Sequence, residues 1–282
     1  MTLLQTEPTS IKIWSTDIKK VYLGTTQVRP KPDYLCFTAE AYGSTISLNA
    51  WSWSPAAVSL ETSTDWRTWT AYTIWDTITL TNIWDKVYWR NTSTTDTRFS
   101  ISISDFYTFA MTWNIAASGD VNYLLNKNST DTLSDSCFAG LFRFNTSLTA
   151  APELPATTIS SACYYTMFIG CTSLVTPPEL PATTVYDYSY SNMFSGCTNL
   201  TSITKLPATS LQIQSYYRMF RNCSSIKLST TKTWAYQTEY RVPISWTGSN
   251  QYAVEDMFYN TWGTFKGTPT LNTTYYTSNT LV

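Results

Sequence analysis

The sequence contains no histidine. Histidine is the commonest general base and metal ligand in proteins, so its absence excludes Ser-His and Cys-His nucleophiles and histidine-bound metals. An acid–base site would have to use carboxylates, and Glu153 and Glu179, which are 26 positions apart, are the pair that could supply them,. Lys205 occupies the next equivalent position, which indicates a solvated edge instead. We therefore expect no enzyme, no catalytic residues, no cofactor and no metal site.

Charged residues are also scarce. Only 13% of the 282 residues are Asp, Glu, Lys or Arg, about half the usual share, and the net charge is -1,. A nucleic acid requires a basic face and an anionic membrane attracts a polybasic stretch, and the sequence has neither. It also lacks an apolar run of about 18 residues and a basic leader followed by an apolar segment. We expect no nucleic-acid partner, no membrane insertion and no signal peptide.

Glycine is scarce for a turn-rich chain, with nine glycines against twelve tryptophans. Several tryptophans stand where a turn favours glycine. Trp66 follows an Asp between two predicted strands, where Asp-Gly is the usual hairpin pair,. Trp75 and Trp84 each precede an Asp at a strand entry, where a positive φ is expected,. By contrast, Trp69 and Trp89 lie in strand-like surroundings that suit an indole.

Two interpretations of the other ten tryptophans are open. They can form an exposed aromatic binding surface, since Trp is enriched at interaction hot spots. Alternatively, the gene uses UGA codons that its host reads as glycine, as some bacterial lineages and their phages do, and a translation that assigns UGA to Trp misstates them. The conversion would raise glycine to 19 residues, close to the usual share of about 7%,. We favour the second interpretation for ten positions: Trp14, Trp51, Trp53, Trp66, Trp75, Trp84, Trp113, Trp234, Trp246 and Trp262.

What the chain has in abundance is a 26-residue repeat between residues 137 and 228. Its units include LFRFNTSLTAAPELPATT, MFIGCTSLVTPPELPATT, MFSGCTNLTSITKLPATS and MFRNCSSIKL. A fixed period of this length is typical of stacked units that bury their apolar faces against each other. We predict a β-solenoid over residues 118–282 that ends in a C-terminal cap. Its inward stacks are expected at Phe142, Phe168, Phe194, Phe220, Leu148, Leu174, Leu200, Ile226, Cys171, Cys197 and Cys223.

Each unit is expected to contain a short strand and a short helix. Prolines extend the segment 174–180, because proline biases itself and the preceding residue toward β conformations. The segment 189–197 groups Met and aromatic residues before a Gly, which predicts one or two helical turns. Cys171, Cys197 and Cys223 share one repeat position and should stack roughly 4.8 Å apart. We expect buried free thiols there, because a ladder of three cannot pair fully.

The MFxGCTSL and PELPATT motifs resemble the leucine-rich repeats of BspA-like surface proteins, which occur in bacterial surface adhesins and in structural proteins of phages. The resemblance covers about a third of the chain. It implies a leucine-rich-repeat fold and leaves the ligand open. The segment KKVYLGTTQVRP similarly resembles the N-terminal leaders of phage tail and fibre proteins, which dock onto the particle.

The first part of the chain is predicted to be β as well, so the fold class is mainly β. Residues 1–33 are expected to form the leader, with a hairpin between Ile11, Ile13 and the segment 21–23, and a stiff linker. Residues 34–117 alternate apolar and polar residues in six runs, which predicts a β-sandwich. These runs are STISLN, AVSLETST, DTITL, DKVYWR, FSISIS and FYTFAM.

The resemblances imply a non-enzymatic virion structural protein of the tail-fibre or head-decoration type. Its leader would bind other virion proteins, and its solenoid would bind a glycan or protein on the host surface. A bacterial cell-surface adhesin is the alternative, and a depolymerising tail-spike enzyme is less favoured. A homo-oligomer stays open. The aromatic candidates for ligand binding are Tyr165, Tyr186, Tyr188 and Tyr217; since Tyr164, Tyr190 and Tyr216 share one repeat position, we expect some tyrosines in the core.

Overall fold

The computed structural model describes residues 21–23, 26–28, 33–51, 58–93, 98–125, 133–208, 210–229, 252–263 and 275–276. The chain divides into two compact units, Met1–Asp33 and Tyr34–Val282. In the first, β1 (Val21–Leu23) pairs antiparallel with β2 (Thr26–Val28). We expected the first of these strands to pair with Ile11 and Ile13, and both isoleucines lie outside the described residues.

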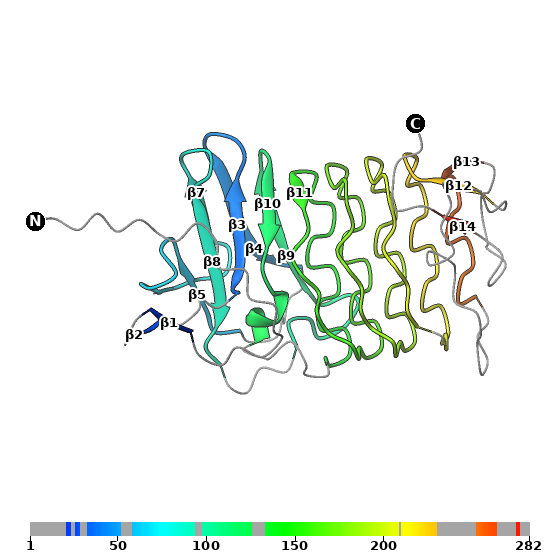
Figure 1. Ribbon diagram of the computed structural model, residues 1–282, viewed down its shortest axis with the longest axis horizontal. Helices are drawn as coiled ribbons and strands as arrows, with labels where there is room; N and C mark the ends of the chain where they lie inside the picture. The colour runs from blue at the N-terminus through cyan, green and yellow to red at the C-terminus, as the bar shows by residue number, and fades with distance from the viewer. Residues whose placement is uncertain are drawn as a thin grey trace, which may run out of the picture. The chain divides into compact units, whose positions relative to one another are not determined.

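Two sheets form the start of the second unit, which we call the two-sheet region (described residues 34–51, 58–93 and 98–118; Figure 1); residues 148–150 of the first coil add the outermost strand to one of these sheets. One sheet has the order β11-β10-β3-β8-β5-β6 and the other β7-β4-β9. The strands are β3 (Leu35–Ala39), β4 (Ser44–Ala50), β5 (Leu60–Ser63), β6 (Thr70–Ala71), β7 (Thr77–Leu80), β8 (Lys86–Asn91), β9 (Tyr107–Thr112), β10 (Ile115–Ser118) and β11 (Leu148–Ala150). The described part of the chain is therefore mainly β, as predicted.

The two sheets meet through aromatic side chains. Phe37 on β3 and Trp89 on β8 lie 4.8 and 5.1 Å from the ring of Phe109 on β9, measured between ring centroids. All three side chains are buried. Edge-to-face and tilted contacts of this kind contribute beyond the area that the rings bury. The core of the two-sheet region therefore lies between its sheets.

Five of the six predicted strand runs contain a strand, but FSISIS does not. The amide groups of Phe99 and Ser100 both donate to the carbonyl of Cys137, 3.0 and 2.9 Å away. The Ser102 hydroxyl accepts from the amide of Asp105 at 3.1 Å, so side chains close a local turn here. Ser and Asp side chains compete with a strand ladder in this way. The alternating pattern of this run was therefore misleading.

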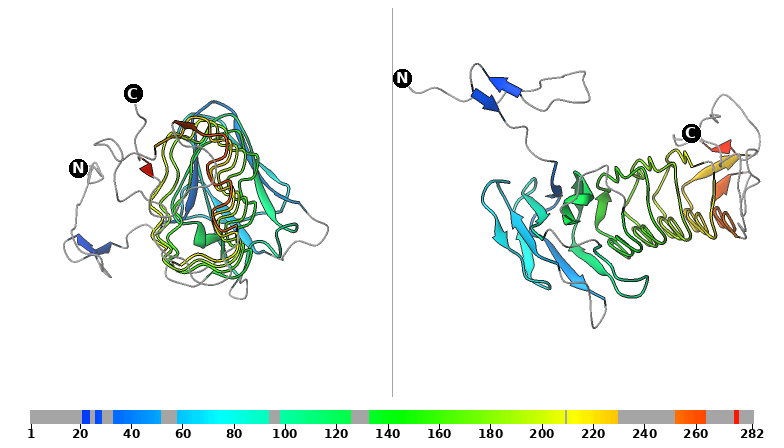
Figure 2. Two further views of the ribbon diagram at one scale, coloured as in Figure 1. Left: turned by 90° about the vertical axis from the view of Figure 1, so that its right-hand side faces the viewer. Right: turned by 90° about the horizontal axis from the view of Figure 1, so that it is seen from below.

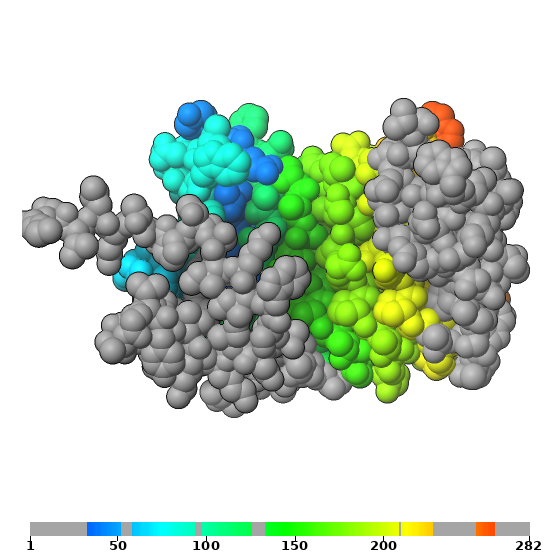
Figure 3. Space-filling view, viewed as in Figure 1, coloured from blue at the N-terminus to red at the C-terminus, as the bar shows by residue number. Residues whose placement is uncertain are grey.

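After the short 3₁₀ helix η1 (Val121–Leu125), the chain forms stacked coils, which we call the coil stack (described residues 133–208, 210–229 and 252–263; Figures 1 and 2). The rings of Phe142, Phe168, Phe194 and Phe220 follow one another at 5.3, 5.5 and 5.4 Å. Phe258 continues the column at 5.7 Å. All eleven residues predicted to face inward are buried. Figure 3 shows the outer side of successive coils as neighbouring ridges, from green to yellow.

No helix forms at residues 189–197, so that prediction was wrong. The amides of Ser191 and Met193 donate to carbonyls three residues back. Those of Tyr190 and Asn192 donate instead to Ser215 and Tyr217 of the next coil, at 2.9 and 2.8 Å. An α-helix needs every amide for its own i-4 carbonyl. Alternate amides are already used between coils, so the segment forms a chain of tight turns.

These turns require a left-handed residue at every fourth position. In one coil the residues with positive φ are Tyr188, Asn192 and Gly196, at 59°, 55° and 78°. A type II turn has positive φ at its third residue, where Gly or Asn fits best. The repeat supplies Gly or Asn at some of these positions and other residues elsewhere. Hydrogen bonds between coils thus offset the backbone strain at the non-glycine residues with positive φ.

The predicted strand at 174–180 is also absent, although the segment lies against its neighbours. Pro177 and Pro178 lack amide hydrogens and cannot donate to a ladder. Single bonds remain, such as that from the amide of Thr201 to the carbonyl of Val175 at 3.1 Å. The remaining strands are β12 (Lys227–Ser229), β13 (Trp262–Gly263) and β14 (Tyr275–Tyr276), which form one small sheet.

The two-sheet region and the coil stack share one core. Phe109 lies 5.4 Å from Phe142 with nearly parallel rings, and its amide donates to the carbonyl of Leu141 at 2.8 Å. In return, the Asn145 side chain donates to the carbonyl of Phe109 at 3.2 Å. Strand β9 therefore covers the end of the first coil, which would otherwise expose apolar surface and open backbone groups.

The Phe column should dominate the stability of the coil stack. Replacing Phe168 by Ala removes a fully buried ring between two others and should lower the free energy of unfolding by about 3–5 kcal/mol. Phe144→Ala is the control, because this ring is 56% exposed and should cost less than about 1 kcal/mol,. Urea denaturation measures both, and equal losses would show that the column is not the main core.

Candidate functional site

The four tyrosines proposed as ligand contacts differ in exposure. Tyr186 and Tyr188 lie on one coil and expose 47% and 39% of their surfaces. Tyr165 and Tyr217 are half-buried, and the guanidinium of Arg218 lies 4.5 Å from the ring of Tyr217. Exposed phenol rings offer both stacking and hydrogen bonding at a low cost in conformational entropy. Tyr186 and Tyr188 are therefore the most accessible of the four.

The tyrosines that share one repeat position are core residues. The ring of Tyr190 lies 5.8 Å from that of Tyr164 and 5.6 Å from that of Tyr216, and all three are buried. Burial raises the pKa of each phenol, because the charged form would lose its hydration,. This second aromatic column takes no part in a surface site.

The cysteines of the repeat are free and buried, and those at the predicted ladder position have defined hydrogen-bond partners. The thiols of Cys171, Cys197 and Cys223 donate to Phe carbonyls in the preceding coil, each at 3.0 Å. The position holds Asn145 in the first coil, whose side chain donates to the carbonyl of Phe109 on β9, and Thr261 in the last, whose hydroxyl donates to the carbonyl of Phe258 in its own coil. Each residue at this position therefore carries a hydrogen-bond donor. Burial raises the pKa of Cys197 to about 12, so the thiol is not a nucleophile at neutral pH,.

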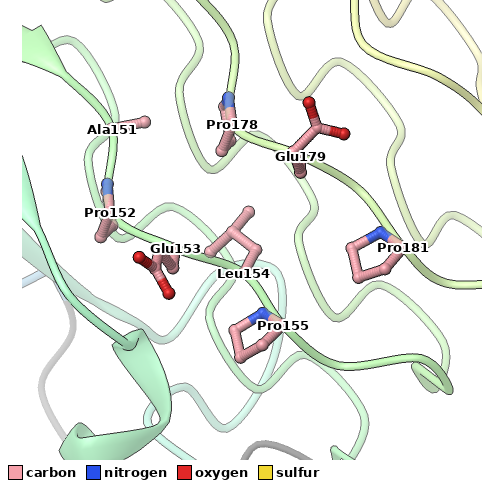
Figure 4. Close-up of a pocket in the computed structure, with 8 residues that line it drawn as sticks. All are labelled: Ala151, Pro152, Glu153, Leu154, Pro155, Pro178, Glu179 and Pro181. Atoms are coloured by element: carbon pink, nitrogen blue, oxygen red, sulfur yellow. The ribbon is translucent and has the colours of Figure 1, made fainter. Parts of the chain in front are cut away.

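Glu153 and Glu179 lie at a cavity of about 370 Å³, which we call the proline cavity (Figure 4). Its other lining residues are Ala151, Pro152, Leu154, Pro155, Pro178 and Pro181. Both glutamates are exposed, and Figure 4 shows their carboxylates pointing away from each other. The Glu179 carboxylate instead accepts a bond from the Thr204 hydroxyl at 3.4 Å. This arrangement does not bring two carboxylates to one substrate bond.

A second cavity, of about 310 Å³, lies where the two-sheet region meets the first coil, and we call it the junction cavity. Trp51, Trp75, Arg143 and Phe144 contribute to its lining. The Arg143 guanidinium lies 4.8 Å from the Phe144 ring, a favourable cation–π distance,. An aromatic face can stack on a ring of a ligand, and the guanidinium beside it can pair with an anion. The shape of this cavity depends on the two tryptophans.

Sequence reasoning missed Arg143 and Phe144 as candidate residues. Phe144 occupies the repeat position of Gly170 and Gly196 in the following coils. Its ring covers Gly170, where an added Cβ would lie only 2.6 Å from a Phe144 ring atom. The fourth unit has Asn222 at this position, so a bulky ring in place of Gly or Asn was the signal available in the sequence.

The described tryptophans fall into distinct groups. Trp66, Trp75, Trp84 and Trp113 have positive φ, whereas Trp51 and Trp262 are exposed without it. Trp89 is buried, and Trp69 contacts the ring of Tyr34 at 4.8 Å. The other four of the ten positions are outside the described residues, namely Trp14, Trp53, Trp234 and Trp246.

Comparison with known proteins adds no relative: no family model, no curated protein and no solved structure matches the chain. Among the described residues there is no group of three acidic or thiol side chains that could hold a metal ion. The described part of the chain also has no helix with the length and apolar character to cross a membrane.

Buried thiols predict a stability that falls at alkaline pH. Above pH 9 the cysteines of the unfolded chain ionise, whereas folded Cys197 stays protonated up to about pH 12. Ionisation therefore stabilises the unfolded state relative to the folded state in this pH range. The free energy of unfolding should therefore fall as pH rises through this window. The triple substitution Cys171→Ser, Cys197→Ser and Cys223→Ser keeps a donor and should make the fall shallower. An unchanged slope in pH-dependent urea melts would refute this role of the thiols.

Proposed function

We propose that this chain is a non-enzymatic virion structural protein of the tail-fibre or head-decoration type. In this proposal a β-sandwich and a leucine-rich-repeat β-solenoid form its body. The N-terminal segment attaches to other virion proteins, and the solenoid binds a glycan or protein on the host surface.

The observation that carries the proposal is the separation, within the coil stack, of buried repeat positions from outward-facing side chains. Phe, Leu, Tyr and Cys positions of the repeat are buried, while side chains such as Tyr186 and Tyr188 point outward from the same coil. Outward residues can change without disturbing the columns inside, because each coil rests only on its neighbours. Such a body suits recognition of a surface that varies between hosts.

The chemistry of the outer surface supports recognition by stacking and hydrogen bonding. A net charge of -1 spread over 18 basic and 19 acidic residues provides little long-range attraction,. Exposed tyrosines and hydroxyl side chains instead suit neutral glycans and polar protein surfaces. The divergent carboxylates of Glu153 and Glu179 give no support to the tail-spike enzyme, so we do not propose hydrolysis.

The separation of Met1–Asp33 from Tyr34–Val282 as compact units supports an attachment segment distinct from the binding body. A chain lacking residues 1–33 should no longer be incorporated into particles but should still bind cells. Mass spectrometry of particles purified from the source, with and without the truncation, measures incorporation. Recovery of the full chain only in a bacterial envelope fraction would favour the cell-surface adhesin instead.

The exposed tyrosines should contribute to cell binding. Changing Tyr186 and Tyr188 together to Ala should weaken binding of the labelled chain to bacterial cells about tenfold or more, as loss of aromatic anchors does at other interfaces. Tyr42→Ala serves as the control, because Tyr42 in the two-sheet region is even more exposed, at 72%. Flow cytometry over a panel of isolates from the source measures binding. Equal losses of cell binding in the Tyr186 and Tyr188 double variant and in Tyr42→Ala would show that the coil stack is not the binding surface.

A further inference from the structure

Few of the described residues in the two-sheet region have positive φ, and they belong to only two residue types. Among its described residues they are Gly43, Trp66, Trp75, Trp84 and Trp113, with φ of 68°, 56°, 79°, 75° and 60°. Apart from the glycine, every one is a tryptophan. Left-handed backbone is routine only for glycine, and a bulky residue there is a genuine outlier. Four outliers of one residue type indicate a common cause.

Two of these tryptophans occupy the same position of equivalent turns. The amide of Asp76 donates to the carbonyl of Thr73 at 3.0 Å, and the amide of Asp85 to that of Asn82 at 3.1 Å. Each bond closes a four-residue turn with its tryptophan third. A third residue with φ near 80° defines a type II turn, for which glycine is the favoured residue.

The backbone around these turns is held in place by the neighbouring strands. The amide of Trp75 donates to Leu48 on β4 at 3.0 Å, and that of Trp84 donates to Ala39 on β3 at 2.8 Å. The indoles themselves are 61% and 72% exposed. The left-handed conformation therefore comes from the turn and its strand contacts, and the side chain contributes little to it.

The tryptophans that do pack have ordinary backbones. Trp89 is fully buried beside Phe109, and Trp69 lies 4.8 Å from Tyr34 and 4.1 Å from the Arg90 guanidinium. Neither of them has positive φ. These two are the tryptophans whose surroundings suit an indole in the sequence. Side-chain packing and backbone conformation thus agree for these two and for the four left-handed tryptophans, whereas Trp51 has an ordinary backbone and an exposed ring that stacks on Phe106 at 5.9 Å.

Left-handed residues in the coil stack do not weaken this distinction. There the positive φ recurs at every fourth residue and is occupied by many types, including Tyr188, Arg218 and Gly170. Hydrogen bonds to the next coil hold each of those turns. The two-sheet region has no such repeat, and its left-handed sites are occupied by glycine or tryptophan alone within the described residues.

We propose that the natural protein carries glycine at positions 66, 75, 84 and 113, because UGA codons at these positions are read as glycine where the protein is made. Glycine removes the strain at all four sites. It also removes the Trp75 side chain from the lining of the junction cavity, where Trp51 and Phe144 remain. This inference goes beyond the proposed function and does not depend on it.

One tryptic peptide of the natural protein tests the proposal with an internal control. Cleavage after Arg67 and Lys86 releases a peptide that contains Trp69, Trp75 and Trp84. Tandem mass spectrometry of material from the source should find an indole at the first position and glycine at the other two. The gene should carry UGA at positions 75 and 84 and UGG at 69. Three indoles in this peptide, or UGG at all three codons, would overturn the proposal.

Recombinant variants of the full chain test the same point through stability. Trp75→Gly and Trp84→Gly together should raise the melting temperature, because they relieve two left-handed turns without removing packed surface. Trp69→Gly should lower it, because the contacts with Tyr34 and Arg90 are lost. Thermal unfolding followed by circular dichroism compares the three proteins. A double variant that melts as low as Trp69→Gly would show that these turns do not require glycine.

Discussion

The coil stack depends on one backbone constraint, the alternate use of amide groups within a coil and between coils. In the second coil the amides of Ala162, Tyr164, Thr166, Phe168 and Gly170 donate to the next coil, and the amides between them close tight turns. Each bond contributes about 0.5–1.5 kcal/mol net, and each non-glycine residue with positive φ costs of the order of 1 kcal/mol. The bonds between coils therefore compensate for the strain only where a neighbouring coil is present.

This requirement explains why the ends of the stack matter. The first coil obtains its partner from strand β9, through the backbone of Phe109 and the side chain of Asn145. Asn145 stands at the cysteine position of the repeat here, and its side chain donates to the carbonyl of Phe109. At the other end, the amide of Trp262 in β13 donates to the carbonyl of Ile226 at 2.9 Å. The Phe column then runs from Phe142 in the first coil to Phe258 in the last.

The sequence predicts the inner columns well and the turn geometry poorly, for a physical reason. Residues such as Phe168 and Cys171 recur at a fixed period, and burial follows directly from the period. Met193, Phe194 and Cys197 have spacings that a helix would also show. What separates a helix from a chain of turns is the partner of each amide, and the partners of Tyr190 and Asn192 lie about a whole repeat away.

The candidate surface is predictable only in part. The 26-residue period distinguishes buried Tyr190 from exposed Tyr188, because Tyr190 shares its repeat position with the inward-facing Tyr164 and Tyr216. Arg143 and Phe144 could not be placed near Trp51 and Trp75, because they meet only after β9 packs on the first coil. The left-handed backbone at Trp75 and Trp84 was predictable from turn chemistry, because the amide of the Asp that follows each of them closes a four-residue turn.

The alternate bonding between coils can be observed directly in solution. Scalar couplings across hydrogen bonds, measured by NMR on isotope-labelled protein, identify the carbonyl that accepts from each amide. Our account predicts a coupling between the amide nitrogen of Phe168 and the carbonyl carbon of Met193, whose oxygen lies 2.9 Å from that nitrogen. A coupling from Phe168 to the carbonyl of Tyr164, as in an α-helix, would contradict it.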